Sequence, residues 1–160
     1  MVRLDLYWLF NLVFYSLLNR RRIPLLRGFA NEHGLHFQET FDQSQLDFYR
    51  SDLYKGGHLY NSIFGVVGDA SFVYFEQRLR NGGRESALAF RLSSDRFEPL
   101  HPAMFGFLTT RTDSHCFFWW DEYLVPLKEL DSFFKQGVMA FQAATTADSP
   151  SISPGSKFTK

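Results

Sequence analysis

The stretch HLYNSIFGVVGDASFVYFEQRLR, residues 58 to 80, decides the fold. It is rich in β-branched and aromatic residues, and the pair Gly68-Asp69 divides it into two runs. A glycine-led pair between two such runs is typical of a tight β-hairpin turn. In the second run, alternate positions form two faces, one with Val73, Phe75 and Leu79 and the other with Phe72, Tyr74, Glu76 and Arg78. The sequence therefore predicts two antiparallel strands joined by a hairpin.

Three further segments have the composition of strands, and one has the periodicity of a helix. The predicted strands are ESALAFRL at residues 85–92, MFGFLTT at 104–110 and SHCFFWW at 114–120. Together with the hairpin they predict an antiparallel meander of about five strands with one buried face. The segment PLKELDSFFKQGVMAFQ, residues 126–142, repeats apolar residues at helical spacing and should pack across that face. The predicted fold class is α+β.

The N-terminal segment LYWLFNLVFYSLLNRRR, residues 6 to 22, is apolar and then basic. As a helix, the thirteen residues from Leu6 to Leu18 would be about 20 Å long, whereas a bilayer core is about 30 Å thick. Asp5 precedes the run, and no small-residue cleavage site follows it. The sequence therefore disfavours both a full membrane span and a cleaved signal peptide, and predicts a short apolar helix with a basic end.

On a helical wheel this segment is weakly amphipathic. One broad sector holds the polar residues together with two aromatic ones: Asp5, Trp8, Asn11, Tyr15, Ser16 and Asn19. The other side holds Phe10, Val13, Phe14 and Leu17. Such a helix can lie in a membrane interface, with the basic run at anionic headgroups. The expected membrane-contact residues are Trp8, Phe10, Phe14, Tyr15, Arg20, Arg21 and Arg22. A helix buried in a soluble domain, or in a contact between copies, is the alternative.

Domain boundaries follow from composition. Residues 1–22 form the apolar helix and its basic end, residues 23–142 a single α+β domain, and residues 143–160 a small, polar, proline-containing tail that is predicted to be disordered. Pro24 suits the first turn of a short second helix, for which Gly34 is the predicted C-terminal cap. Another short helix is predicted at residues 43–48.

Bulk composition argues against several functional classes. The formal net charge is zero and the pI about 7.0, so an overall positive field, which is the best support for nucleic-acid binding, is missing. The single cysteine, Cys116, allows neither an internal disulfide nor a cysteine-rich zinc site. With 19 phenylalanines, the chain is expected to have a rigid aromatic core.

No catalytic, cofactor-binding or metal-binding site is predicted. Successive strand residues point to opposite faces, so His115 and Cys116 cannot readily bind one metal. The adjacent acids Asp121 and Glu122 should diverge for the same reason, which does not suit a glycosidase pair. Neither a G-x-S-x-G elbow nor a phosphate-binding glycine motif occurs.

The stretch YKGGHLYNSIFGVVGDASFVYFEQRL resembles a family of uncharacterised bacterial proteins that have an N-terminal hydrophobic segment and a following basic stretch. Their domain carries G-x-x-basic-x-x-N-x-x-x-G and then a strand ending in F-D-Y. The first part of this pattern is matched by Gly56 or Gly57, Asn61 and Gly65. Phe75-Glu76 stands at the F-D position, and Gln77 replaces the tyrosine. The stretch LLRGFANEHGLHF is similar to the family's preceding helix. The resemblance covers residues 6 to 142 and implies membrane anchoring of a small α+β domain.

Gly65 is expected to permit a bulge or a close backbone approach, and Asn61 to cap a neighbouring turn through its amide. The resulting prediction is a membrane-associated, non-enzymatic interaction domain on the cytoplasmic side, because basic residues beside an apolar segment favour that side. Its expected partners are membrane lipid and a protein partner or second copy, with no nucleic acid and no cofactor. The alternative is a soluble cytoplasmic ligand-binding protein or enzyme with a pocket between sheet and C-terminal helix, for which His115, Glu76 and Arg78 are the first candidates.

Overall fold

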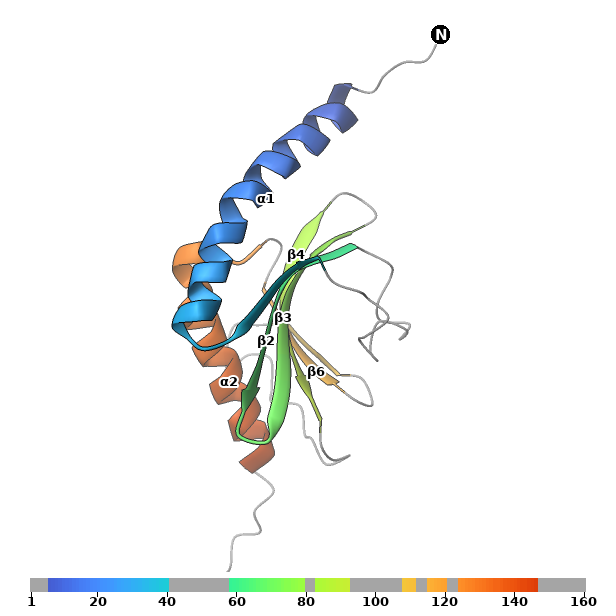
Figure 1. Cartoon of the computed structure of the whole chain (residues 1–160). Coiled ribbons are helices and arrows are strands. Elements are labelled where there is room, and N and C mark those ends of the chain that lie inside the picture. The colour runs from blue at the N-terminus through green and yellow to red at the C-terminus, as the bar shows by residue number, and fades with distance from the viewer. Residues whose placement is uncertain are drawn as a thin grey trace, which may run out of the picture.

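The computed structural model describes residues 6–40, 58–79, 83–92, 108–111, 115–120 and 124–146. Within this part of the chain, an antiparallel sheet of six strands carries two helices on one face (Figure 1). The strands are β1 (His36–Thr40), β2 (His58–Val67), β3 (Ala70–Arg78), β4 (Arg84–Arg91), β5 (Leu108–Arg111) and β6 (His115–Trp119). The helices are α1 (Leu6–Glu32) and α2 (Leu130–Thr146), and a short 3-10 helix, η4 (Leu127–Glu129), leads into α2.

The predicted hairpin forms the centre of this sheet. β2 and β3 pair from His58↔Arg78 to Val67↔Ala70, and the two residues between them form the turn. Gly68 adopts a φ of +59°, which glycine tolerates without the steric cost other residues bear. The next connection returns β3 to β4 with Arg78 opposite Arg84. The α+β class and the two-residue turn are confirmed.

The strand order corrects the predicted meander. The order is β1-β2-β3-β4-β6-β5, so β6 lies between β4 and β5. Four of the five residues of β6 are buried, and an apolar strand of this kind is best covered inside a sheet, whereas the four-residue β5 takes the edge. β1, at the other edge, was not predicted because its sequence HFQET is short and mostly polar.

The centre of the sheet is buried on both faces, although one solvent-facing side was predicted. Along β3 every residue from Phe72 to Gln77 is buried. The predicted alternation is correct, because Phe72 and Tyr74 join the cluster under the helices while Val73 and Phe75 join a separate cluster on the other face. Tyr74 and Glu76 are therefore core residues.

The C-terminal helix packs closely on the sheet, as predicted. Phe141 of α2 stacks on Phe90 of β4, with ring centroids 4.4 Å apart and planes within 9°. A Cβ on Gly137 would lie 2.6 Å from Cδ2 of Leu88, so glycine brings the helix close to β4. α2 continues to Thr146, past the predicted start of the tail at residue 143, and the rest of that tail lies outside the described residues.

One helix replaces the two predicted at the N-terminus. α1 runs through Pro24, which is solvent-exposed, so water can reach the carbonyl of Arg20 that a proline cannot bond. After Glu32 the chain closes the helix as predicted: Gly34 has a φ of +66°, and the amide of Leu35 donates to the carbonyl of Ala30 at 2.7 Å. The helix predicted at residues 43–48 lies outside the described residues.

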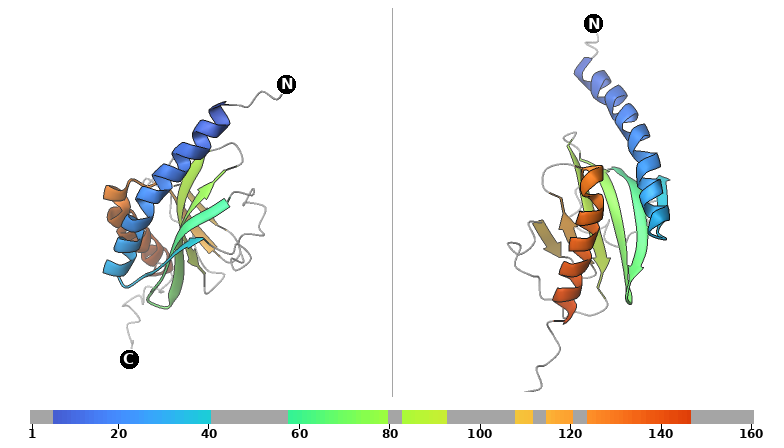
Figure 2. Two further views of the ribbon diagram at one scale, coloured as in Figure 1. Left: turned by 45° about the horizontal axis from the view of Figure 1, so that its top comes forward. Right: turned by 90° about the vertical axis from the view of Figure 1, so that its left-hand side faces the viewer.

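The first half of α1 extends beyond the sheet. In Figures 1 and 2 the C-terminal half of α1 lies beside α2 on one face of the sheet, and the N-terminal half continues past the end where β3 finishes and β4 begins. In the part of the chain that the structure describes, no helix is long and apolar enough to cross a membrane.

Candidate functional site

A buried ion pair ties α1 to the centre of the sheet. Glu76 is fully buried on β3, and Arg22 of α1 reaches it with Nε 3.0 Å from Oε1 and with Nη2 on the same oxygen. Nη2 also donates to the carbonyl of Val125 at 2.9 Å, just before η4. The guanidinium of Arg22, whose side chain is only 15% exposed, thus joins α1, β3 and the segment leading to α2.

The remaining bonding capacity of Glu76 is filled by neutral donors. Asn61 Nδ2 donates to Oε2 at 2.9 Å, and the hydroxyl of Tyr74 donates to Oε1 at 2.8 Å. That hydroxyl has one hydrogen, so it accepts from Ser86 Oγ, 3.2 Å away. Ser86 Oγ in turn accepts from the amide of Val125 at 3.0 Å. We call Arg22, Asn61, Tyr74, Glu76 and Ser86 the Glu76 cluster.

Asn61 reaches this cluster through an irregularity in β2. The pairing of β2 with β3 shifts between Tyr60 and Ile63, and Asn61 has a φ of +50°. Asparagine tolerates this left-handed conformation better than most residues, and a bulge redirects side chains. Asn61 Nδ2 also donates to Oδ1 of Asn19 on α1. The sequence predicted that this amide caps a local turn, but in the structure it holds α1 against the sheet.

The electrostatics of the cluster favour a structural role. Burial is the largest single influence on Arg22 and opposes its charge, but the charge and hydrogen bond of Glu76 together with Tyr74 outweigh it, so the pKa of Arg22 is raised and the cation persists. The carboxylate of Glu76 accepts hydrogen bonds from Arg22, Tyr74 and Asn61. It therefore has little remaining capacity to accept a proton from a substrate as a general base. A saturated, charge-balanced carboxylate is what a buried ion pair needs in order to be tolerated.

Removing the Tyr74 hydroxyl should change stability at high pH. Burial and the charge of Glu76 raise the pKa of Tyr74 well above its usual 10.0. Above pH 10 the unfolded chain therefore loses a proton that the folded chain keeps, and stability falls by up to about 1.4 kcal/mol per pH unit from this group. At pH 7, Tyr74→Phe should lower the free energy of unfolding by about 1–2 kcal/mol. Between pH 9.5 and 11, urea unfolding should show that the free energy of unfolding of this variant falls less steeply with pH than that of the unmodified protein. Equal slopes for both proteins would contradict this.

The candidates for the enzymatic alternative do not converge. Glu76 and Arg78 lie two residues apart on β3, near the end that pairs with the start of β4. His115 pairs with Arg91 at the other end of β4. Cys116 joins the core under the helices, whereas the ring of His115 lies 6.2 Å from that of Phe117 in the opposite cluster. Asp121 and Glu122 lie outside the described residues, among which no group of histidine, cysteine and acidic residues could hold a metal.

Aromatic rings occupy the space between the sheet and α2. Phe134 lies 5.8 Å from Phe72 and 5.4 Å from Tyr74, measured between ring centroids. Phe133 meets Tyr74 edge to face at 6.4 Å. These contacts pack α2 directly on the sheet, at the position where the alternative function needs a pocket.

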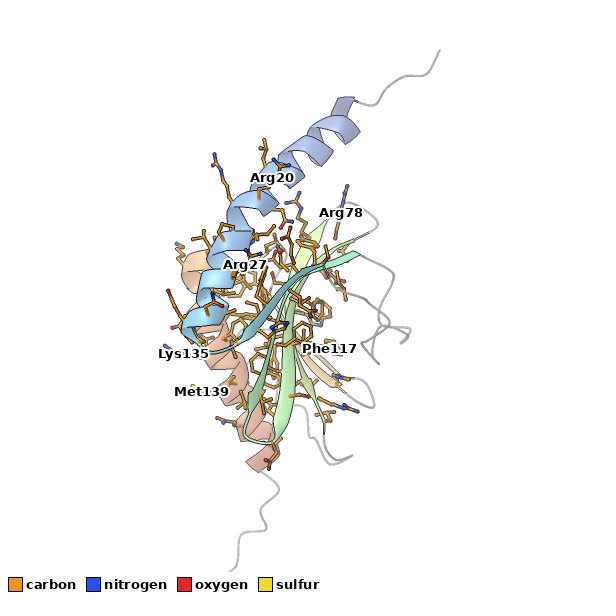
Figure 3. The ribbon with its side chains drawn as sticks, viewed as in Figure 1. Arg20, Arg27, Arg78, Phe117, Lys135 and Met139 are labelled. Atoms are coloured by element: carbon orange, nitrogen blue, oxygen red, sulfur yellow. The ribbon has the colours of Figure 1, made fainter. Side chains whose placement is uncertain are left out.

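The face of α1 that points away from the sheet is solvent-exposed. Leu17 and Leu25 each expose 56% of their surface. Among the described residues, Arg20 and Arg21 form no hydrogen bond or ion pair, and Figure 3 shows Arg20 where α1 leaves the sheet. We call Leu17, Arg20, Arg21, Pro24 and Leu25 the outer face of α1.

The three arginines that were predicted to contact a membrane do not behave alike. Arg20 and Arg21 are exposed, but Arg22, expected at headgroups, points into the domain and binds Glu76. The side chains of Trp8, Phe10, Phe14 and Tyr15 lie outside those described. The sequence contained a signal that one arginine turns inward. Glu76 shares a face of its strand with Phe72 and Tyr74, and a carboxylate buried among aromatic residues needs a cation.

The residues that carry the family resemblance occupy packing positions. Asn61 bonds to Glu76, which stands at the family's acid position. A Cβ on Gly65 would lie 2.5 Å from the ring of Phe72 and 2.6 Å from Leu35, so the expected close approach is confirmed. Comparison of the chain with protein-family models, curated proteins and solved structures gives no match.

Proposed function

We propose that this protein is a membrane-associated, non-enzymatic binding domain that attaches to lipid through α1. The observation that carries the proposal is the division of the basic run: Arg22 holds the helix to the domain, while Arg20 and Arg21 remain exposed and unpaired among the described residues. An apolar sequence extends from that point past the sheet. Anionic headgroups would complete the missing charge pairs, and lipid would cover the apolar residues.

The inward-facing residues of α1 explain how the domain would be held at a membrane. Asn19 and Arg22 attach α1 to β2 and β3 through partly buried hydrogen bonds. A helix fixed in this way transmits its position on the membrane to the sheet. Because clustered arginines beside an apolar segment favour the cytoplasmic side, we place the domain there.

Flotation on vesicles tests the proposal directly. We expect the intact chain to float with vesicles containing phosphatidylserine and to release as salt rises. Arg20→Glu and Arg21→Glu, made singly, should each weaken binding at least about fivefold, since a basic residue near an anionic surface contributes about 1 kcal/mol.

Arg91→Glu is the matched control. It makes the same charge change at an exposed arginine of β4, on the sheet face opposite the helices. We expect it to bind vesicles like the unmodified chain. The proposal fails if the intact chain stays at the bottom of the gradient, or if all three variants lose binding equally.

A soluble binding protein or enzyme remains the rival function, but no observation in the described residues favours it. His115 lies at the opposite end of β4 from Glu76 and Arg78, and aromatic side chains pack α2 directly on the sheet where the pocket was expected.

A further inference from the structure

We infer that α1 lies along the surface of an anionic phospholipid membrane, with its outer face toward the lipid and the sheet on its other side. This inference rests on the proposed function and specifies its geometry. A helix standing upright in the membrane would satisfy the proposed function equally well, so the two arrangements must be separated by the positions of individual residues.

The roll of α1 about its own axis is fixed by its contacts. Asn19, Arg22 and Leu26 follow one another at helical spacing and all face the domain, where Asn19 and Arg22 are hydrogen-bonded and Leu26 is fully buried. Leu17 and Leu25 lie on the opposite side, eight residues apart. The helix therefore presents one defined face outward for at least two turns.

The apolar sequence continues this face toward the N-terminus. By helical periodicity, positions 10, 13 and 14 fall on the same side of α1 as Leu17, and the chain has Phe, Val and Phe there. Asn19 belongs to the more polar sector of the wheel, and it faces the domain. The more apolar side of the first half is thus aligned with the outer face of the second half.

Leu25 distinguishes the lying helix from an upright one. It follows the basic residues and is as exposed as Leu17, at 56%. With about 1.5 Å of rise per residue, the two leucines are about 12 Å apart along the axis. An upright helix that inserts its N-terminus would leave Leu25 in water, whereas a lying helix buries both leucines at one depth. Arg20 and Arg21, between them, can extend their long side chains to the headgroups.

A depth measurement on the full chain tests this arrangement. Leu17→Cys and Leu25→Cys, each labelled with an environment-sensitive fluorophore, are mixed with vesicles of phosphatidylcholine and phosphatidylserine. Val66→Cys is the control, because Val66 is exposed at 67% on the sheet face opposite the helices. The native Cys116 is buried, and labelling of the unmodified chain measures its background. We expect blue shifts at positions 17 and 25, equal quenching by lipid-borne quenchers, and no change at position 66.

Three results would overturn the inference. A shift at position 17 without one at position 25 means an upright helix, and the proposed function then stands. Shifts at both positions without vesicles, together with a dimer in light scattering, mean that a second copy covers the outer face. Failure of the intact chain to float overturns the proposed function itself. As a second measurement, Leu25→Glu should weaken flotation about tenfold or more, whereas Val66→Glu should not.

Discussion

Replacing Glu76 with alanine is expected to destabilise the domain by about 3–5 kcal/mol, which is typical when one partner of a buried ion pair is removed. The change leaves Arg22 charged and largely buried, and it removes the acceptor that Tyr74 and Asn61 use. Urea unfolding followed by circular dichroism measures the loss. Since the cluster joins α1 to β2, β3 and the start of α2, the loss should appear in the cooperative transition of the whole domain.

A matched variant and a double variant sharpen this prediction. Glu129→Ala removes a half-buried glutamate from η4, whose nearest ion-pair partner is the exposed Lys128, and should change stability by less than about 0.5 kcal/mol. In Arg22→Ala/Glu76→Ala no charge remains unpaired, so the double variant should lose clearly less than the sum of the two single losses. If Glu76→Ala loses no more than Glu129→Ala, the ion pair does not hold α1 to the sheet.

Replacing Phe90 with alanine is expected to destabilise the domain by about 3–5 kcal/mol, the usual range for emptying a buried phenylalanine site. Phe90 is fully buried at the contact between β4 and α2, where it stacks on Phe141 and lies 5.7 Å from the rings of both Phe72 and Phe118. Neighbours held in a rigid aromatic packing cannot collapse into the space. Thermal and urea unfolding measure the effect.

A companion variant tests whether both faces of the sheet are core. Phe75 is fully buried on the face opposite the helices, where it meets Trp119 edge to face at 6.0 Å. Phe75→Ala should therefore lose an amount similar to that of Phe90→Ala. A loss below about 1 kcal/mol for Phe75→Ala, with a large loss for Phe90→Ala, would mean that the sheet is covered on one side only.

Local chemistry made much of the fold predictable. Gly68-Asp69 and Gly34 gave correct turn and cap positions because positive φ values are strongly biased toward glycine. The spacing of Leu130, Phe134 and Phe141 gave the correct packing face of α2. The prediction failed where it depended on non-local choices, as when β6 enters the sheet beside β4, and where Pro24 was expected to start a new helix.

The candidate site was predictable only in part. The apolar-then-basic order singled out the N-terminal segment, and the structure leaves Arg20 and Arg21 exposed, whereas membrane contact through them stays a prediction. The sequence could not reveal that Arg22 turns inward, because three successive arginines look alike until the roll of the helix is known. That roll is set by two contacts between distant segments. Glu76 binds Arg22, which is 54 residues away, and Asn61 binds Asn19, which is 42 residues away.

By itself, the sequence determined the α+β class, the central hairpin and the C-terminal packing helix, because turn residues and hydrophobic periodicity act over a few neighbouring positions. Only the tertiary structure decided which arginine is structural and which face of α1 is exposed. A buried carboxylate requires a cation, and the geometry of the sheet brings Arg22 within reach of Glu76 while directing Arg20 and Arg21 outward. Such pairings depend on contacts between distant segments, which exist only after the chain has folded.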